Sequence, residues 1–194
     1  DFYEKGEWLG EIKIPLPGLH NLSNSAAAIS ACRLGGISFK RLKNIIHKLE
    51  APYRRFQYRG TWNNRQIVDD YAHHPSEIKA ILSMCKLMIK SKKSILPKIP
   101  NRIVAIFEPH RFSRTKDFLS DFAMSFANAD SIIIAPIYGA GELPIKGITN
   151  EYLAKIIKNK NQSISIFTAN NFDDLIHLIT KHTKENDLIL NLGA

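Results

Sequence analysis

Short apolar runs alternate with helix-like segments after Pro52, and this alternation limits the possible folds more than any other feature of the chain. Four apolar runs have the length and composition of buried strands, at residues 102–107, 131–137, 163–167 and 187–192. Apolar residues at helical spacing predict four helices, at residues 75–90, 115–127, 149–159 and 171–181. Because apolar strands separated by helices build a parallel sheet that is covered on both faces, we predict an α/β fold with a mostly parallel sheet.

A β-hairpin is predicted ahead of the first of these helices. The segments 53–60 and 65–70 are rich in strand-forming residues and flank a turn that contains Asn63 and Asn64. Residues 90–100, by contrast, predict a loop.

The first 52 residues have a different pattern. Residues 7–14 resemble a short strand, followed by helices at 21–34 and from the N-cap Ser38 to residue 49. We predict that this pair of helices lacks a sheet of its own and is the tail of a domain that begins earlier. The expected domain boundary therefore separates residues 1–52 from residues 53–194.

The net charge, the two cysteines and the lack of a long apolar segment limit the partners, the metal sites and the location expected for this chain. The chain of 194 residues has a net charge of +9, which is compatible with a nucleic-acid, membrane-surface or phosphorylated small-molecule partner, or with no specific partner. Cys32 and Cys85 are far apart on apolar helical faces, which favours buried thiols over a disulfide or a zinc site. The absence of a long apolar run and of a secretion signal predicts a cytoplasmic protein.

Three predicted strands are followed by chemically unusual residues: DDYAHHP near 69–75, EPHRFSRT at 108–115 and YGAGE at 138–142. In an open α/β sheet, ligands bind where strands end and helices begin, so one crevice is expected to collect all three turns. Adjacent strand residues point to opposite faces, so we take Asp70 as the site carboxylate and Asp69 as a cap or ion-pair partner. The structural alternative is a helix cap with His73 and His74 as surface histidines.

Arg111 and Arg114 are three residues apart at a predicted helix start, where they can converge on one anion. Ser113 or Thr115 is expected to cap that helix. The alternative is that the two arginines form ion pairs with acidic neighbours, Glu108 or Asp117. The glycines of YGAGE either expose backbone amides to a ligand or simply form a tight turn.

Two nucleotide-binding motifs are absent. Gly139 and Gly141 would need a third glycine at position 144 for a dinucleotide fingerprint, and Pro144 stands there. No G-x-x-x-x-G-K-[ST] phosphate loop occurs in the chain.

Taken together, five blocks in this order and at these intervals resemble the Mur ligase family: PGLHNLSNSAAAISA, YRRFQYRG, VDDYAHHPSE, EPHRFSRTKDF and IYGAGELPIKG. The His-Arg-aromatic-x-Arg run at 110–114 resembles most closely the member that adds L-alanine to UDP-N-acetylmuramate. The alternatives are the related ligase that recycles murein tripeptide, and a non-catalytic basic module that binds phosphate or nucleic acid.

The resemblance implies a fragment of a three-domain, ADP-forming enzyme of peptidoglycan synthesis. Residues 1–52 match the end of the central ATP-binding domain, and residues 53–194 match the Rossmann-like C-terminal domain, cut within its last turn. The phosphate loop, the Mg²⁺ ligands and a modified lysine are expected in the missing part, so the isolated piece is expected to be inactive. The family uses ATP to make an acyl phosphate, which the amine of L-alanine then attacks.

The resemblance also implies roles for individual residues. The expected ATP contacts are His20, Asn21, Asn24, Arg55 and Asp70, with the asparagines at the adenine, Arg55 at the phosphates and Asp70 at the ribose. The expected amino-acid pocket consists of Tyr71, His73, His110, Arg111 and Arg114. Arg55 and His73 are the expected catalytic residues, and His73 would orient or deprotonate the amine of alanine.

Overall fold

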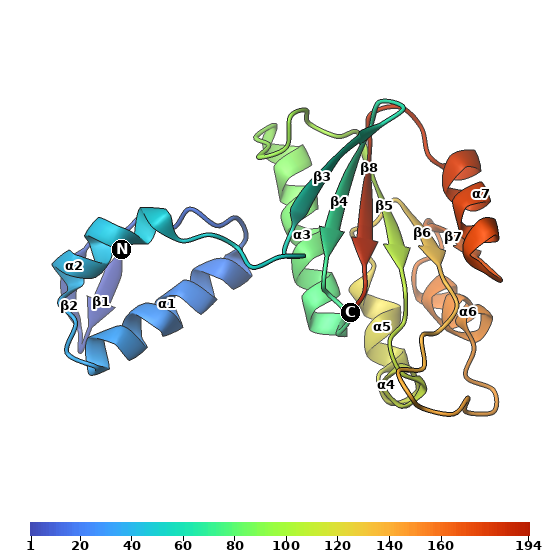
Figure 1. The fold of residues 1–194 in the computed structure, drawn as a ribbon, viewed down its shortest axis with the longest axis horizontal. Helices are drawn as coiled ribbons and strands as arrows, with labels where there is room; N and C mark the ends of the chain where they lie inside the picture. Colours follow the sequence, from blue (N-terminus) through green and yellow to red (C-terminus); the bar gives the residue numbers. More distant parts are fainter. The chain divides into compact units, whose positions relative to one another are not determined.

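The structure is a computed structural model that describes residues 1–194. The chain divides into two compact units, Asp1–Pro52 and Tyr53–Ala194, and each is described by itself (Figure 1). Whether the first unit is the end of an ATP-binding domain stays a prediction.

The first unit contains a small sheet as well as the predicted helices. Its elements are β1 (Phe2–Glu4), β2 (Glu7–Gly10), α1 (Leu19–Leu34), α2 (Phe39–Ile45) and a 3₁₀ turn, η1 (Ile46–Lys48). Ser38 caps α2 by accepting a hydrogen bond from the backbone N–H of Arg41, as predicted. The prediction that this region lacks a sheet is wrong, because β1 and β2 pair antiparallel. The strand predicted at 7–14 is present in part, as β2, and a turn at Lys5 and Gly6, both with positive φ, joins it to β1, which is too short to show a period in the sequence.

The second unit is the predicted α/β fold. Its elements are β3 (Gln57–Trp62), β4 (Arg65–Asp70), α3 (Pro75–Ser91), β5 (Arg102–Phe107), α4 (Phe112–Asp117), α5 (Leu119–Ser125), β6 (Ser131–Ile134), α6 (Asn150–Lys160), β7 (Ser165–Thr168), α7 (Phe172–His182) and β8 (Asp187–Leu192). The six strands lie in the order β3-β4-β8-β5-β6-β7, and only the β3–β4 pair is antiparallel. The last strand of the chain is therefore inserted in the middle of the sheet (Figure 1).

Alternation along the central strands distributes their side chains to two cores. Ile103, Ala105 and Phe107 of β5 point to the larger core, together with apolar residues of α3, α5 and α6. Val104 and Ile106 point to the opposite face, where they pack with residues of α7. Helices thus cover both faces of the sheet, as the sequence predicts, and the strands are apolar on both sides for that reason.

The predicted hairpin is formed by β3 and β4. Asn63 and Asn64 have φ values of 43° and 61°, the left-handed conformation that a two-residue hairpin turn requires at both positions and that asparagine tolerates well. The first strand begins at Gln57 instead of residue 53, because Arg54 and Phe56 also have positive φ, which is incompatible with a strand.

The helix observed near residues 115–127 differs from the predicted one in two ways. It begins earlier, at Phe112, and it is divided into α4 and α5 at Phe118, whose φ of −111° and ψ of 22° leave the helical range. The ring of Phe118 packs edge-on against His74, with 4.8 Å between the ring centroids.

The strand predicted to reach residue 137 ends at Ile134, two residues before Pro136, which has no N–H for a sheet hydrogen bond.

Both cysteines are free thiols, as predicted, although Cys32 is only half-buried. Burial raises the pKa of the Cys85 thiol to about 12.

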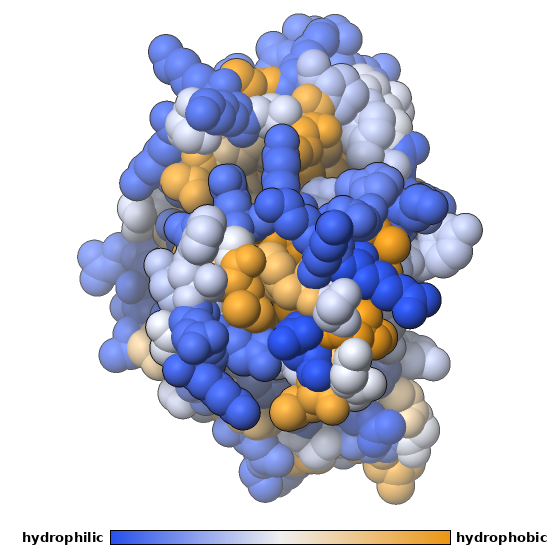
Figure 2. Space-filling model, turned by 90° about the vertical axis from the view of Figure 1, so that its left-hand side faces the viewer, coloured by the Kyte–Doolittle hydropathy of each residue, from blue (hydrophilic) through white to orange (hydrophobic).

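On the face that Figure 2 presents, hydrophilic side chains surround smaller hydrophobic patches. No helix of the structure combines the length and the apolar character that crossing a membrane demands.

Candidate functional site

Three strand-end turns meet at one edge of the sheet. The strands β4, β8, β5 and β6 are parallel neighbours, so the turns that follow β4, β5 and β6 emerge on the same side. The ring centroids of His73 and His110 are 6.0 Å apart, and those of His110 and Tyr138 are 5.5 Å apart. The prediction that these turns come together is therefore confirmed, and their forming one ligand-binding crevice stays a prediction.

The two adjacent aspartates at the end of β4 have different partners. Asp69 forms an ion pair with Arg54, with 3.2 Å between Oδ2 and Nε, as expected for this residue. The Asp70 side chain is buried and accepts hydrogen bonds from the backbone N–H of Ala72 at 2.9 Å and of Phe56 at 2.7 Å. Asp70 therefore fixes the backbone at the edge of the site, and its expected contact with a ribose stays a prediction.

Tyr71 and His73 extend from the turn between β4 and α3 and pack edge to face, with ring centroids 5.3 Å apart. The guanidinium carbons of Arg54 and Arg55 lie 5.1 Å and 5.6 Å from the centre of the Tyr71 ring. Aromatic faces attract cations at these distances, so Tyr71 holds both arginines beside the turn that follows β4. Arg55 remains about half exposed, at 46%, and is accessible to an anion.

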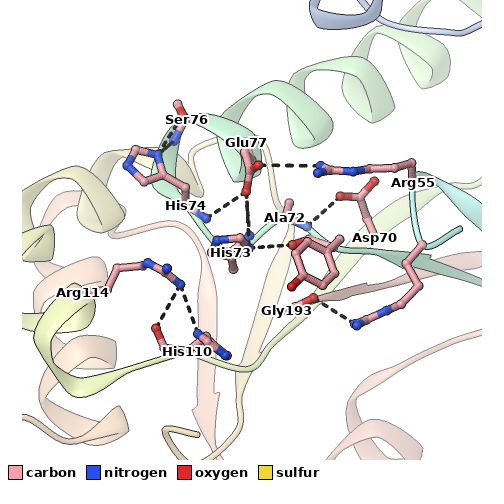
Figure 3. Close-up of polar contacts among 12 residues, drawn as sticks. Arg55, Asp70, Ala72, His73, His74, Ser76, Glu77, His110, Arg114 and Gly193 are labelled. Carbon is pink, nitrogen blue, oxygen red and sulfur yellow. Dashed lines mark hydrogen bonds and ion pairs between the residues drawn. The ribbon is translucent and has the colours of Figure 1, made fainter. Parts of the chain in front are cut away.

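His74 caps helix α3. Its Nδ1 accepts a hydrogen bond from the backbone N–H of Ser76, and the carboxylate of Glu77 accepts one from the backbone N–H of His74 at 3.2 Å (Figure 3). This is a capping box, in which two otherwise unpaired helix donors are satisfied reciprocally. The structural alternative, a helix cap, therefore holds for His74.

Arg111 occupies a strained position before α4. Its φ is 75°, and its backbone N–H donates a hydrogen bond to the carbonyl oxygen of Tyr138 at 2.8 Å. Its Nη1 lies 3.5 Å from a carboxylate oxygen of Glu142. The predicted alternative partners, Glu108 and Asp117, form no ion pair with either arginine.

The prediction that Ser113 or Thr115 caps this helix is wrong. The backbone N–H and the hydroxyl of Ser113 both donate to the carboxylate of Glu142, at 2.9 Å and 2.6 Å. The Thr115 hydroxyl instead donates to the carbonyl oxygen of Arg111. A distant carboxylate thus performs the capping, and the positive end of the helix dipole favours a negative charge there.

Arg114 contacts His110, one turn earlier in the chain. Its Nη1 lies 3.3 Å from Nδ1 of His110 and donates to the carbonyl oxygen of His110 at 3.2 Å (Figure 3). Partial burial lowers the pKa of His110, and the positive charges of Arg114, His73 and Arg111 lower it further. His110 is therefore neutral at neutral pH.

The YGAGE segment forms a tight turn. Ala140 and Gly141 have φ values of 50° and 87°, and the backbone N–H of Glu142 donates to the carbonyl oxygen of Gly139 at 3.0 Å. Gly139 cannot be enlarged without movement, because a Cβ there would lie 2.9 Å from the carbonyl oxygen of Glu142. Of the two sequence interpretations, the turn is the one that the structure contains.

The remaining predicted ATP contacts lie in the first unit, in the first two turns of α1. His20 and Asn21 are half-buried and Asn24 is exposed. The Asn21 side chain donates a hydrogen bond to the carbonyl oxygen of Pro17 at 2.7 Å. The contact of these residues with ATP, and of the two asparagines with its adenine, stays a prediction.

Three residues of the site received no role from the sequence: Glu77, Tyr138 and Glu142. A signal for Glu77 existed, because it stands three residues after the cap position, where a capping box has its acidic residue. No local signal identifies Glu142, whose partners are separated from it by about 30 residues and are brought close only by the sheet. No group of three or more His, Cys, Asp and Glu side chains is arranged to hold a metal ion.

Comparison with known proteins gives consistent matches. Residues 54–194 match the family model described as "Mur ligase, glutamate ligase domain". The whole chain is 52% identical to a UDP-N-acetylmuramate–L-alanine ligase of Prochlorococcus marinus (strain MIT 9313), and 48% identical to one of Synechococcus sp. (strain CC9311). The chain spans about 40% of the length of these curated relatives.

Two solved structures share the fold. A UDP-N-acetylmuramate-alanine ligase of Thermotoga maritima superimposes with a TM-score of 0.68 over 98% of this chain and 38% of its own, at 23% identity. A murein peptide ligase of Psychrobacter arcticus gives a TM-score of 0.67 over 94% of this chain and 35% of its own, at 26% identity.

Proposed function

Because the chain belongs to the Mur ligase family, we propose that it is part of an ADP-forming ligase that joins L-alanine to UDP-N-acetylmuramate in peptidoglycan synthesis. The observation that carries this proposal is the meeting of three strand-end turns at one edge of the sheet, where imidazole and guanidinium groups lie close together. The names of the relatives that are about 50% identical over the whole chain support the choice of alanine as the amino acid.

The chemistry requires activation of an acid. A carboxylate and an amine do not condense in water, so ATP first transfers its γ-phosphoryl group to the muramoyl carboxylate and leaves as ADP. The free amine of L-alanine then attacks the acyl carbon, the new C–N bond forms, and phosphate leaves with the C–O bond electrons. Both steps depend on holding charged groups in line and on neutralising the charge of the phosphoryl oxygens.

The second unit supplies groups for both substrates. Arg111 and Arg114 bind the alanine carboxylate, because planar guanidinium groups hold a carboxylate with two parallel hydrogen bonds. His73 orients or deprotonates the amine, and Tyr71 and His110 line the pocket. Neutral His110 adds a polar contact without adding a further charge.

Arg55 and Asp70 are the proposed ATP contacts of this unit. Arg55 is exposed enough to reach phosphate oxygens, whereas Asp70 would reach a ribose only while it also holds two backbone amides. Asn21 and Asn24 are the proposed adenine contacts of the first unit, since amide groups donate and accept together. His20, next to Asn21 in the chain, is a further proposed ATP contact with no part of ATP assigned to it.

The chain alone is expected to be inactive, because it contains neither a phosphate loop nor a cluster of metal ligands. None of its residues is assigned to Mg²⁺, which the family uses with ATP. Release of ADP by the isolated chain, with ATP, UDP-N-acetylmuramate and L-alanine present, would contradict this. The use of ATP and a UDP-sugar places the proposed reaction in the cytoplasm.

Kinetics of the full-length ligase separate the two proposed pockets. Arg111→Ala is expected to raise the apparent KM for L-alanine about tenfold or more, whereas Asp70→Asn is expected to raise mainly that for ATP. As a control, Lys116→Ala removes an exposed cation from helix α4 and should change neither KM value. If both test variants lowered only thermal stability and left both KM values intact, the residues would be structural.

A further inference from the structure

Glu77 lies between the two groups of residues that the proposed function assigns to different substrates. Its Oε1 is 3.7 Å from Nη1 of Arg55, the expected ATP-phosphate contact. Its Oε2 accepts the backbone N–H of His73 at 3.1 Å and lies 3.6 Å from Nδ1 of the same residue, the expected amine contact. Figure 3 shows this carboxylate at the centre, with one oxygen toward each residue.

The charge of Glu77 is maintained in this position. Partial burial acts to raise the pKa of its carboxyl group, but the hydrogen bonds from the backbone N–H groups of His73 and His74 lower it. The positive charges of His73 and Arg55 lower the pKa as well, and the net shift is downward. Glu77 is therefore a fixed anion at neutral pH.

Helix capping explains only half of this arrangement. The capping box with His74 uses Oε2 and the helix donors, and it would form equally well without Arg55. The contact of Oε1 with Arg55 joins two partly exposed side chains, and such pairs contribute little to stability. Its effect is to restrict where the guanidinium lies.

The same carboxylate restricts the imidazole of His73. Nδ1 of His73 lies 2.9 Å from the carbonyl oxygen of Tyr71, which can only accept, so Nδ1 carries the proton. In the neutral form of His73, Nε2 is then the ring nitrogen with a free lone pair, as orienting or deprotonating an amine requires. Glu77 stands on the protonated side and favours this tautomer.

We propose that Glu77 is a positioning residue that sets Arg55 for the ATP phosphates and His73 for the incoming amine at the same time. This inference rests on the proposed function. A single substitution at Glu77 then affects both substrates, although Glu77 itself touches neither.

The test uses the full-length ligase with Glu77→Gln, which keeps the shape and one capping oxygen but removes the charge. We expect the apparent KM values for ATP and for L-alanine each to rise about two- to fivefold, as the loss of a partly exposed ion pair implies, with little change in melting temperature. In an Arg55→Ala background, Glu77→Gln should no longer raise the KM for ATP but should still raise that for L-alanine.

His74→Ala is the matched control, because it weakens the same helix cap without touching the Oε1 contact. Equal kinetic effects of His74→Ala and Glu77→Gln would overturn the proposal, and so would a change in the KM of only one substrate. The single variants Arg55→Ala and His73→Ala distinguish a failure of the proposed function from a failure of the role of Glu77. If they leave both KM values unchanged, the proposed function fails; if they change them and Glu77→Gln does not, only the role of Glu77 fails.

Discussion

The two turns that supply most of the site are built in opposite ways. The turn between β4 and α3 is closed by its own residues: His74, Ser76 and Glu77 satisfy the first donors of α3 within four positions. The turn between β5 and α4 is closed by Glu142, whose partner Ser113 is 29 residues earlier in the chain. The helix cap of the first turn is thus local, whereas that of the second turn exists only when the sheet has formed.

This difference determines how each turn responds to change elsewhere. Arg111 has a left-handed backbone, which costs about 1 kcal/mol or more in a residue with a side chain. The hydrogen bond from its N–H to Tyr138 and the contact of its side chain with Glu142 offset that cost, and both come from the loop after β6. We therefore expect substitutions in that loop to move Arg111 and to leave His73 in place.

The largest effect is expected at Asp70, the buried residue that precedes the turn between β4 and α3. Asp70→Ala leaves the backbone N–H groups of Phe56 and Ala72 without their acceptor and should lower the free energy of unfolding by about 2–3 kcal/mol. Urea denaturation of a Trp8→Phe background, in which Trp62 reports on the second unit, measures this. Asp69→Ala is the control. An equal loss of unfolding free energy in this control would show that the hydrogen bonds of Asp70 to the backbone add no stability of their own.

The next effect concerns the long-range turn. Gly139→Ala places a Cβ 2.9 Å from the carbonyl oxygen of Glu142 and 3.2 Å from the ring of Phe112, so the loop must shift. We expect a loss of about 1–3 kcal/mol, together with altered amide chemical shifts of Arg111 and Ser113 and unchanged shifts of His73. Ala140→Gly, in the same turn, adds no atoms and should leave the Arg111 signal in place. Equal shifts at His73 would contradict the distinction between the two turns.

His74→Ala should cost less, about 1 kcal/mol, because it removes only a helix cap. Its effect should be confined to the first turn of α3, which hydrogen exchange of the α3 amides measures. His74→Ser restores a capping oxygen and should recover most of the loss. A similar loss in His74→Ser would mean that packing of the imidazole against Phe118, instead of capping, is what matters.

The smallest effect is on proton binding in the long-range turn. Arg114→Ala removes a positive charge beside His110 and should raise the pKa of His110, which NMR titration of its ring signals measures. Because folding lowers this pKa, the unfolded chain binds the proton first, so His110 reduces stability as pH falls below its ordinary value of about 6.5. Arg114→Ala should reduce this loss of stability at low pH. A fall in the pKa of His110 in the variant would contradict the assignment of the lowered pKa to the charge of Arg114.

The comparison also explains what the sequence could predict. The β3–β4 hairpin follows from Asn63 and Asn64, and α3 follows from Pro75 and a continuous apolar stripe, because each is decided by neighbouring residues. The convergence of the strand-end turns followed from a general rule of parallel sheets, which holds whatever the strand order.

The missed features all depend on residues distant in the chain. Nothing near Asp187 indicates that β8 lies between β4 and β5, and nothing near Ser113 indicates that Glu142 caps its helix. The positive φ of Arg111 likewise accompanies a hydrogen bond from its N–H to Tyr138, 27 residues later, which no neighbouring residue indicates. In the first unit, β2 lies within the predicted strand at 7–14, but its partner β1 was missed, since a strand of three residues is too short for a period to appear.

A crystal structure of the full-length ligase with a non-hydrolysable ATP analogue, UDP-N-acetylmuramate and L-alanine would test the central claim most directly. We predict that the alanine carboxylate lies within hydrogen-bonding distance of the Arg111 or Arg114 guanidinium, with its amine toward His73. An alanine bound beyond reach of all three side chains would contradict the assignment of this crevice as the amino-acid site.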